Sequence, residues 1–537
     1  MSIIKKRNII ICLLALLILP IFFSGSVVYA EEKVLNLATA SEPPTVDPAL
    51  ATDTTSGSVI DNVFETLTKV NKEGEIIPGA AASWEVSEDG TTYTFHLQPE
   101  GKWSNGEPVT AKDFEYSWKR LLNPDTGSQR GNLYYVIKGA KAYHEEDGSL
   151  EEVGIKAVDD HTLEITLVAP AAYFLEQVSH YAFAPVYQSA VEGNDAWAAE
   201  AGEDFVTNGP FVLSEWNHQA DYTLTPNEHY WDRDKVKLDK VNVQIVESET
   251  TANTAFQAGD FDYIGAPYST VATDFIQLYK NQDQLNVEPI SSIYWYKVNT
   301  TDPIMQNVNI RKALASAIDR KQLVEQVTKG EQEPATGIVP STVKGFEEPR
   351  DYFKDNDPEA AKEFLQKGLE ELDMKSPEEL TIALSINTSE DHSAIAQFIQ
   401  QEWTDVLGVN VTIDNSEWQV YLDKVNILDY QVARLGWAGD YNDAFNFLDM
   451  YRTKDTPNNQ TGWGNDEFTR LMEEASAELD EDKRTQLLLD AEAVMMNDMP
   501  VIPIYYYTHL SVQQPRVKNI GPDKVGRINL KEVTVED

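Results

Sequence analysis

A carboxylate and a guanidinium share one apolar segment of this sequence. Residues 433–449, ARLGWAGDYNDAFNFLD, hold Arg434 and Asp440 six positions apart among Gly, Ala, Leu, Trp and Phe. A carboxylate with apolar neighbours is unfavourable unless a positive group meets it. Four interpretations of Asp440 follow: a catalytic acid, a metal ligand, a salt-bridge partner of Arg434, or a counter-ion for a bound cation.

Other patterns for catalysis are weak. No HExxH motif, Walker loop, GxSxG or GxGxxG stands in a suitable context. The eight histidines are scattered and none has another at metal-ligand spacing, so we expect ordinary core or surface residues. Paired carboxylates in a cleft could make a glycosidase, but 88 acidic residues leave any chosen pair unspecific.

The N-terminus has the pattern of a secretory signal peptide. Basic residues 5–7 precede an apolar run over about 9–23, and Val28 and Ala30 are the small residues that a signal peptidase needs. We expect cleavage after Ala30 and an extracytoplasmic protein, periplasmic or secreted; an uncleaved N-terminal anchor is the alternative. No other stretch is apolar over 18 residues, so the mature protein is expected to be soluble.

Cysteine content and charge exclude further classes. Cys12, the only cysteine, follows Ile9-Ile10-Ile11 rather than a small residue, so we expect no lipid anchor. The mature chain then lacks disulfides, thiol catalysis and Cys-based metal sites.

Without the three leader cations, 40 basic residues face 88 acidic ones, a formal charge of −48. This charge argues against nucleic acid and anionic membranes as partners. It indicates a solvated acidic face or, alternatively, adaptation to salt or an alkaline medium.

The elements that must position these residues alternate between strands and helices. In the first part, the pattern predicts strands at 34–40, 159–167 and 240–246, and a strand within 91–106 that ends in a turn at Ser104-Asn105-Gly106. An amphipathic helix is predicted over 110–122, with Thr110 as its N-cap and Asp113 completing a capping box.

The later part is richer in helix. Apolar spacing predicts helices over 309–327, 357–372 and 391–408, the last stopped by Gly408, and two more near 465–478 and 482–497. Strands are predicted at VNVTID (409–414), YQVARLGWAGDY (430–441) and VIPIYYY (501–507). Strand–helix–strand order indicates a mixed α/β domain with a parallel component, and about 507 mature residues require two or three domains.

Several blocks of the sequence resemble one family. They are residues 79–124 (GAAASWEVSEDGTTYTFHLQPEGKWSNGEPVTAKDFEYSWKRLLNP), 205–216 (FVTNGPFVLSEW), 307–320 (NVNIRKALASAIDR), 386–392 (INTSEDH), 407–418 (LGVNVTIDNSEW) and 432–448 (VARLGWAGDYNDAFNFL). In order and spacing, they are similar to the family 5 extracellular solute-binding proteins, the peptide-binding subunits of ABC importers. Among these, the oligopeptide-binding proteins match best.

The resemblance implies an α/β fold of the type II periplasmic-binding-protein kind, with two lobes about a hinge and an additional inserted domain. The implied division is a signal peptide (1–30), a discontinuous domain I (31–64, 189–290 and 506–537), an inserted domain II (65–188) and a domain III (291–505). Two chain crossings between the lobes would act as the hinge, and closure would bury the ligand.

The resemblance also implies the roles of the charged and polar site residues. Asp440 matches the aspartate that receives the peptide's α-ammonium, with pairing to Arg434 or a turn cap as alternatives. Arg434 and His392 match positions that meet the peptide's carboxylate, and Asn387 one that contacts the carboxylate or water. For His392 and Asn387, a surface histidine and a turn-forming asparagine are the competing interpretations.

Aromatic and main-chain contacts are implied at further positions. Trp418 and Trp437 match pocket-lining residues, and residues 52–56, with Thr54, match the segment that pairs with the ligand backbone. Within IYWYKVN, alternation puts Trp295 opposite Tyr294 and Tyr296, so only one set can face the ligand. The expected ligand residues are therefore Asp440, Arg434, His392, Asn387, Trp418, Trp437, Tyr294, Tyr296 and Thr54.

Two departures from relatives bear on the site. Cysteines that some relatives carry near Ser292 and Ala438 are absent here, so that wall has no covalent tether. Lys297 occupies a place where some peptide binders carry an acid near the ligand. This exchange would either alter the preference for a basic peptide side chain or compensate the negative charge that surrounds Lys297.

The function implied is capture of oligopeptides and delivery to an ABC permease in the membrane. We expect a monomer that performs no chemistry, needs no cofactor or metal, and does not bind nucleic acid. The alternatives are a binder of dipeptides, a signalling peptide or a metal chelate, and, from another class, a secreted carboxylate-dependent hydrolase.

Overall fold

The computed structural model describes residues 32–145, 147–456 and 458–536. Residues 33–537 form one compact unit. The expected signal peptide and its cleavage site lie outside the described residues. None of the helices in the described part is long and apolar enough to cross a membrane.

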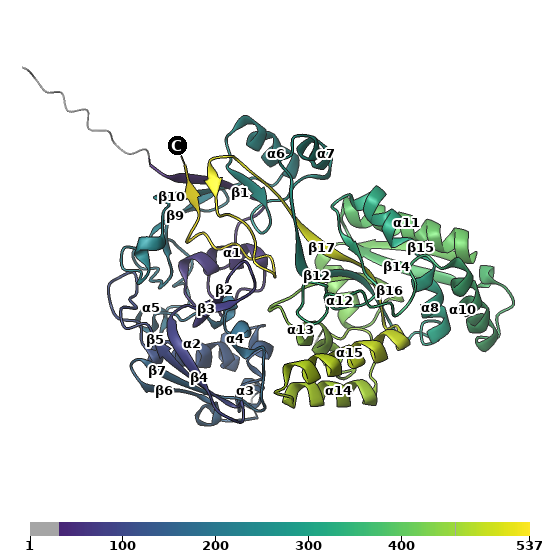
Figure 1. The fold of residues 1–537 in the computed structure, drawn as a ribbon, viewed down its shortest axis with the longest axis horizontal. Coiled ribbons are helices and arrows are strands. Elements are labelled where there is room, and N and C mark those ends of the chain that lie inside the picture. Colours follow the sequence, from purple (N-terminus) through teal and green to yellow (C-terminus); the bar gives the residue numbers. More distant parts are fainter. Residues whose placement is uncertain (1–31, 146, 457, 537) are drawn as a thin grey trace, which may run out of the picture. The chain divides into compact units, whose positions relative to one another are not determined.

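A large mixed sheet runs through this unit (Figure 1). Its strands lie in the order β15 (Asn410–Ser416), β14 (Thr381–Asn387), β16 (Val432–Ala438), β12 (Asn286–Val298), β17 (Val501–Gln513), β11 (Tyr263–Gly265), β1 (Val34–Thr39), β10 (Lys240–Ile245), β9 (Asp221–Pro226) and β8 (Phe211–Asn217), and the short β13 (Glu333–Pro334) pairs with β17. Strand β14 is parallel to β15 and β16, as the strand–helix–strand pattern predicts, and β1 is parallel to β10 and β11. The predicted α/β fold with a parallel component is confirmed.

Two long strands join the halves of this sheet. Strands β12 and β17 have 13 residues each and pair antiparallel. One end of the pair lies beside β11 and the other end of β12 lies beside β16. The β12–β17 register breaks between Pro289 and Ile293. We call the half with β1 and β8–β11 the first lobe and the half with β14–β16 the second lobe.

A smaller antiparallel sheet belongs to the segment that follows β1, residues 65–188, which lies on the side of the first lobe and is counted with it (Figure 1). It has the order β4 (Ala81–Val86), β5 (Thr92–Leu97), β7 (Thr162–Thr166) and β6 (Ile155–Asp159). The helix α2 (Ala111–Leu122) packs against it, and the Thr110 N–H donates to the Asp113 carboxylate at 2.7 Å, which confirms the capping box. The predicted strand over 159–167 is wrong at its start: Asp159 ends β6, a turn follows, and its carboxylate accepts the His161 N–H at 2.8 Å.

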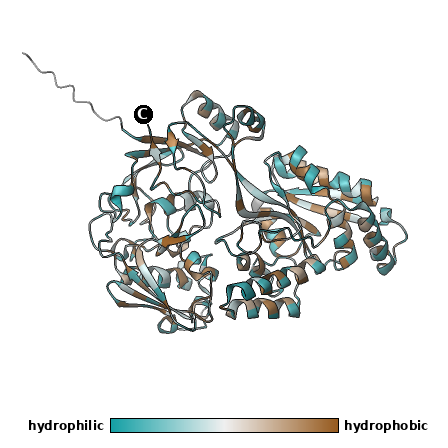
Figure 2. Cartoon of the chain, in the orientation of Figure 1, coloured by the Kyte–Doolittle hydropathy of each residue, from teal (hydrophilic) through white to brown (hydrophobic). Residues whose placement is uncertain are grey.

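Helices cover the strands of the second lobe. The predicted helices appear as α10 (Pro358–Glu371), α11 (Glu390–Leu407), α14 (Asp466–Ala477) and α15 (Glu481–Asp498), and Gly408 ends α11 in the left-handed conformation, with φ of 73°. Around α14, Phe468, Leu471 and Met472 are buried, and Figure 2 shows hydrophobic and hydrophilic residues mixed along α14 and α15.

The helix predicted over 309–327 is interrupted. The chain forms α8 (Val308–Ser316), α9 (Arg320–Leu323) and a π-helical turn (Val324–Thr328). The guanidinium of Arg320, fully buried, donates to the Ala315 carbonyl at 3.0 Å and the Pro503 carbonyl at 2.8 Å. The bond to Pro503 anchors Arg320 to β17, and in that position its guanidinium takes the Ala315 carbonyl that a continuous helix would use, which explains the break.

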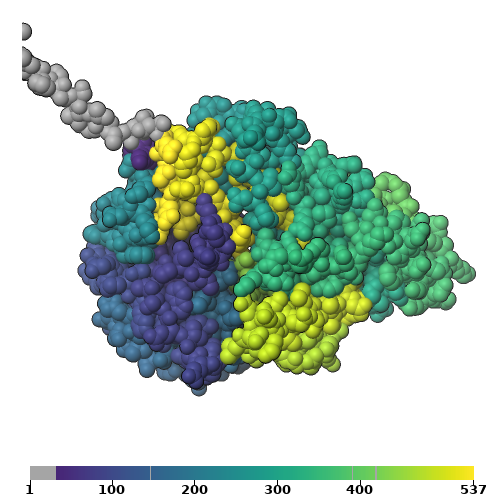
Figure 3. All heavy atoms as spheres, viewed as in Figure 1, coloured from purple at the N-terminus to yellow at the C-terminus, as the bar shows by residue number. Residues whose placement is uncertain are grey.

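The C-terminal segment returns to the first lobe. The Leu530 N–H donates to the side chain of Asn62 on α1 (Thr54–Val63) at 2.8 Å, and Lys531 pairs with Asp232 at 3.2 Å. In Figure 3 these yellow residues lie against the purple N-terminal part of the unit. The remaining described elements are β2 (Thr68–Val70), β3 (Ile76–Pro78), α3 (Ala140–His144), α4 (Phe174–Gln177), α5 (Gln188–Val191), α6 (Glu249–Ala258), α7 (Thr273–Asn281), α12 (Trp418–Asn426), α13 (Ala444–Leu448), β18 (Val517–Lys518) and β19 (Thr534–Val535).

Candidate ligand-binding site

Asp440 lies in the loop that follows β16. The Asn446 side-chain oxygen accepts the Asp440 N–H at 3.3 Å and the Trp437 indole N–H at 2.7 Å. Gly439 allows this loop to approach β12, because its N–H donates to the Ser291 carbonyl at 2.9 Å and an added Cβ would lie 3.2 Å from that oxygen. The loop is thus fixed at both sides of Asp440.

The cation beside Asp440 is Arg130, not Arg434. Arg130 Nη1 lies 3.4 Å from Asp440 Oδ1, and His180 Nε2 lies 3.8 Å from the same oxygen. Burial lowers the pKa of His180 well below its ordinary value, so this ring is neutral near pH 7. Burial raises the pKa of Asp440, and the charge of Arg130 opposes that rise. The expected alternative, a salt bridge between Asp440 and Arg434, is therefore wrong.

Arg434 lies in a polar and aromatic cluster of its own. Its guanidinium stacks over the Tyr294 ring, with Cζ 4.7 Å from the centroid, and donates to Asn387 Oδ1 at 3.3 Å and the Tyr507 hydroxyl at 3.1 Å. The His392 ring lies 5.7 Å from the Tyr294 ring. The structure thus brings four predicted residues together, and among the side chains it describes no carboxylate lies within ion-pair distance of Arg434.

Two nitrogen atoms of this cluster are buried without a partner. Within the described part of the chain, Arg434 Nε and His392 Nδ1 have no hydrogen bond. Burial, together with the charge of Arg434, lowers the pKa of His392 to about 3, so its imidazole is neutral near pH 7. Buried polar groups without partners are unfavourable. The cluster is therefore suited to an anionic group that would accept from these nitrogens.

The strand register decides which aromatic residues belong to this cluster. Tyr296 pairs directly with Arg434 across β12 and β16, and directly paired side chains share a sheet face. Tyr294 and Tyr296 are fully buried on that face, and Trp295 lies on the other. Trp437 pairs with Ile293, so it lies on the Trp295 face and not with Arg434.

The other predicted contacts lie elsewhere. Thr54 is the exposed first residue of α1, so only Thr52 and Asp53 of residues 52–56 precede the helix. The side chain of Trp418 lies outside the described part of the chain. Ser292 pairs directly with Ala438, the two positions where some relatives carry cysteines.

Lys297 lies on the Trp295 face, away from the Arg434 cluster. It is 2 % exposed and donates to the Asn458 carbonyl and, at 3.0 Å, to Gln460 Oε1. Burial lowers its pKa to about 7. The described contacts of Lys297 are thus carbonyl oxygens and the rings of Trp295 and Tyr451.

Residues from the first lobe complete the surroundings of the loop after β16. Tyr441 stacks on Tyr173 with centroids 4.9 Å apart, and Glu176 Oε1 accepts the Asn442 N–H at 2.5 Å. Burial raises the pKa of Glu176 to about 7. Sequence reasoning missed Arg130, Tyr173 and Glu176, because no local pattern links them to a loop about 270–310 positions away.

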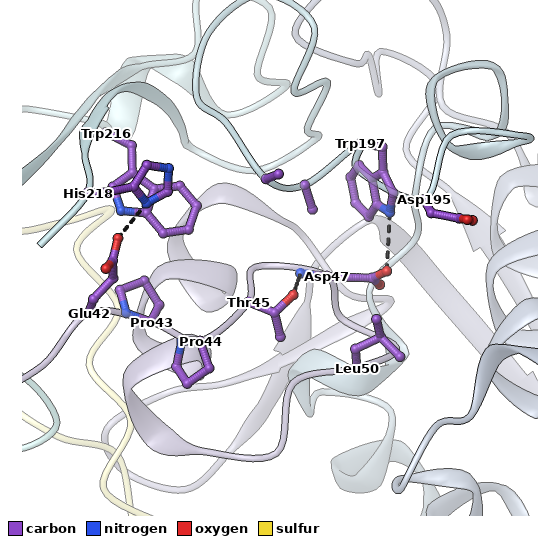
Figure 4. A pocket seen from close by; sticks show the side chains of 12 residues that line it. Glu42, Pro43, Pro44, Thr45, Asp47, Leu50, Asp195, Trp197, Trp216 and His218 are labelled. Carbon is purple, nitrogen blue, oxygen red and sulfur yellow. Dashed lines mark hydrogen bonds and ion pairs between the residues drawn. The ribbon is translucent and has the colours of Figure 1, made fainter.

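A separate pocket of about 410 Å³ lies on the first lobe (Figure 4). Two of its three carboxylates are already partnered: Glu42 meets His218 at 2.6 Å, and Asp47 accepts from Arg120 and from the Trp197 indole. We therefore place no ligand there. The described residues also contain no group of three or more His, Cys, Asp or Glu suited to a metal ion.

Comparison with known proteins identifies the family of this chain. Residues 75–459 match the family model of bacterial extracellular solute-binding proteins, family 5 (middle region). The oligopeptide-binding protein OppA of Bacillus subtilis is 45 % identical over 92 % of this chain and 91 % of that protein. The dipeptide-binding protein DppE of the same organism is 38 % identical over 93 % of this chain and 91 % of its own. A solved structure of Listeria monocytogenes OppA bound to peptide matches with a TM-score of 0.77 and 30 % identity, covering 95 % of this chain and all of that one.

The two-lobed α/β fold, with its polar clusters beside the strands that join the lobes, is that of a type II solute-binding protein. The chain belongs to the bacterial extracellular solute-binding proteins of family 5.

Proposed function

We propose that this protein is the extracytoplasmic substrate-binding subunit of a peptide ABC importer. It captures oligopeptides between its lobes and delivers them to a membrane permease. The observation that carries this proposal is the pair of opposite, incompletely satisfied charges at the two ends of one segment, Asp440 and Arg434. A peptide is a zwitterion with the complementary charges at its two ends.

Asp440 receives the α-ammonium of the peptide. An ammonium that leaves water for a closed site loses several kcal/mol of hydration, on the order of what a fixed carboxylate returns through a charge-assisted hydrogen bond. The Asn446 side chain supports this role because it accepts both the Asp440 N–H and the Trp437 indole N–H, which fixes the start of the loop.

Arg434 and His392 receive the carboxylate of the peptide, with Asn387 beside them. The planar guanidinium donates parallel hydrogen bonds to a carboxylate. Its present partners, Asn387 and the Tyr507 hydroxyl, are neutral. A neutral His392 contributes a hydrogen bond rather than a charge, which its lowered pKa supports.

The peptide backbone adds as an extended strand, so its main-chain groups supply affinity whatever the side chains are. In the segment 52–56, the extended Asp53 backbone, with φ of −123° and ψ of 162°, is suited to this pairing, along with Thr52 and the first residue of α1, Thr54. Tyr294 and Tyr296 border the Arg434 cluster, whereas Trp437, on the other face of the sheet, lines a separate side-chain pocket in which water mediates further contacts.

Closure of the lobes accompanies binding. We assign domain I to 31–64, 189–290 and 506–537, domain II to 65–188 and domain III to 291–505. The bond of Leu530 to Asn62 supports the discontinuous first domain, and the break of the β12–β17 register between Pro289 and Ile293 supports a hinge at the boundary of the third.

The protein works outside the cytoplasm, after cleavage of its signal peptide at Ala30, as a monomer without a cofactor or metal. It performs no chemistry on its ligand. A dipeptide-binding role is the second candidate, because DppE of Bacillus subtilis is 38 % identical over most of both chains.

Mass spectrometry of bound ligands tests the proposal. The protein would be stripped of ligand by partial unfolding, refolded, incubated with a defined mixture of dipeptides to nonapeptides, and separated from unbound peptide. We expect intact peptides of three or more residues. Recovery of dipeptides alone would establish the second candidate, and cleavage products would overturn both in favour of a hydrolase.

A further inference from the structure

Arg130 connects the two proposed binding elements of this site. It precedes a short 3₁₀ turn of the first lobe and lies 310 positions from Asp440 in the sequence. One terminal nitrogen, Nη2, donates to the Thr52 carbonyl at 2.8 Å and to the Tyr181 hydroxyl at 3.1 Å. The other, Nη1, lies 3.4 Å from Asp440 Oδ1.

The three distances show that Nη2 of Arg130 is tightly hydrogen-bonded, whereas Nη1 makes only a long contact with Asp440. Charge-assisted N–H···O bonds have lengths of about 2.7–2.9 Å. The bond to Thr52 has that length, whereas the contact with Asp440 is longer by about half an ångström. Arg130 is therefore anchored on its own lobe, and its charge reaches Asp440 without forming a tight ion pair.

Other groups around Asp440 do not replace this charge. His180, the only other nitrogen base within ion-pair distance among the described side chains, is neutral near pH 7. Arg527 acts on Asp440 from farther away and is already paired with Asp523 at 3.0 Å. The side chains of Arg130 and Asp440 are only 21 % and 14 % exposed, so water screens their interaction weakly.

We propose that Arg130 is a built-in counter-ion of Asp440 that reduces the preference of this site for peptides with a free amino end. This inference rests on the proposed function, in which Asp440 receives the peptide's ammonium. A free ammonium must share Asp440 with Arg130, which weakens its binding. A peptide with a blocked amino end leaves Asp440 facing Arg130, so the carboxylate is not left uncompensated.

Both effects act on one measurable ratio, the affinity for a free-amine peptide divided by that for its N-acetylated form. Removing the charge of Arg130 strengthens binding of the free-amine peptide, because its ammonium no longer shares Asp440. It weakens binding of the acetylated peptide, since Asp440 would then be a buried carboxylate without a partner, which is strongly disfavoured. The ratio therefore increases when Arg130 is neutralised and stays near its original value when the charge is kept.

Calorimetry at pH 7 with tetra-alanine and N-acetyl-tetra-alanine tests this inference. The variants are Arg130→Met, Arg130→Gln, which keeps an amide N–H for the Thr52 carbonyl, and Arg130→Lys, which keeps the charge. We expect both neutral variants to increase the ratio at least tenfold and Arg130→Lys to stay within about threefold of the unmodified protein. Thermal unfolding of each variant shows which ones are folded, and one folded neutral variant is enough to carry out the test.

Asp440→Asn distinguishes a failure of the role of Arg130 from a failure of the proposed ligand site. If Asp440→Asn removes the preference for free amino ends but neither neutral variant raises it, the role of Arg130 is overturned and the proposed function stands. If the unmodified protein and Asp440→Asn show the same ratio, Asp440 does not receive the ammonium. In that case the ligand site itself, and not only the part of Arg130, is wrong.

Discussion

The two charged side chains of the site are satisfied in different ways. Asp440 faces the permanent charge of Arg130 at 3.4 Å, whereas the hydrogen-bond partners of Arg434 are a neutral amide and a hydroxyl. Neither charge is neutralised by a close partner within the second lobe. In the proposed function, a ligand with opposite charges at its two ends complements both, and this complementarity does not depend on the sequence of the peptide.

Replacing Arg434 tests the carboxylate end of this arrangement. We expect Arg434→Met to weaken binding of free-carboxylate peptides by about 2–5 kcal/mol, because the ligand's buried charge would lose its partner. C-terminally amidated peptides should lose far less. Calorimetry with matched free and amidated peptides measures the difference, and Arg233→Met, on the first lobe, is the control for lost positive charge. Equal losses for both peptide forms would contradict the assignment.

The buried Lys297 predicts how stability depends on pH. Burial lowers its folded-state pKa from 10.5 to about 7, so between these values the unfolded chain holds a proton that the folded chain lacks. The free energy of unfolding should therefore rise with pH from about 7 upward, by up to a few kcal/mol by pH 10.5.

Urea unfolding of the unmodified protein and Lys297→Met between pH 7 and 9.5 checks this slope. We expect the variant to be the more stable protein at pH 7 and the difference to shrink as pH rises. The exposed Lys375→Met controls for the change in net charge. A difference that stays constant across this range would show that Lys297 has an ordinary pKa.

Sequence reasoning could predict only part of the candidate site. The apolar surroundings and the family resemblance singled out Asp440 and Arg434, and alternation separated Trp295 from Tyr294 and Tyr296. Which of these two sets shares a sheet face with Arg434 could be decided only from the register of β12 against β16. Arg130 could not be predicted, because its relation to Asp440 depends on how two lobes meet and leaves no local pattern.

Elements were predictable where their signals are local. The capping box of α2 and the Gly408 stop of α11 depend on residues within one helical turn, and both are confirmed. The break between α8 and α9 depends on the bond of Arg320 to the distant Pro503 carbonyl, which competes with an apolar pattern that favours one helix. Tertiary contacts of this kind override local preference.

Gly408 gives a prediction at the scale of one helix. Its φ of 73° suits glycine, and an added Cβ would meet only Pro377 Cβ, at 3.7 Å. Gly408→Ala should therefore reduce stability by about 1–2 kcal/mol through backbone strain alone. Gly408→Asn should lose less, since asparagine tolerates this conformation. Chemical denaturation compares the two, and unchanged stability in Gly408→Ala would contradict the end of α11 described here.

At the scale of the whole molecule, the loop that holds Asp440, the proposed ligand residue, also makes contacts between the lobes. Beside Asp440, Tyr441 stacks on Tyr173 and the Asn442 N–H donates to Glu176, both from the first lobe. If Asp440 binds the ligand as proposed, binding is coupled to how the lobes meet. The sequence pattern required several domains but could not show that a C-terminal segment returns to α1, because the contacts join residues 466–468 positions apart.

The acidic composition predicts a dependence on salt. The whole chain carries a formal charge of −45, and self-repulsion of this size destabilises a compact state. Raising NaCl from low to molar concentration shortens the screening length to about 3 Å, so the melting temperature should rise by several degrees at pH 7. The rise should be smaller at pH 5, where fewer carboxylates are charged. A melting temperature that does not respond to salt would leave only an ordinary solvated acidic face.

Binding of a free amino end by Asp440 is the central claim, and one calorimetric comparison tests it. Tetra-alanine and N-acetyl-tetra-alanine would be titrated into the unmodified protein and into Asp440→Asn. We predict that the substitution lowers the affinity for the free-amine peptide by about 2–5 kcal/mol and changes the affinity for the acetylated peptide little. Equal affinity of the unmodified protein for both peptides, or equal losses for both on substitution, would contradict the claim.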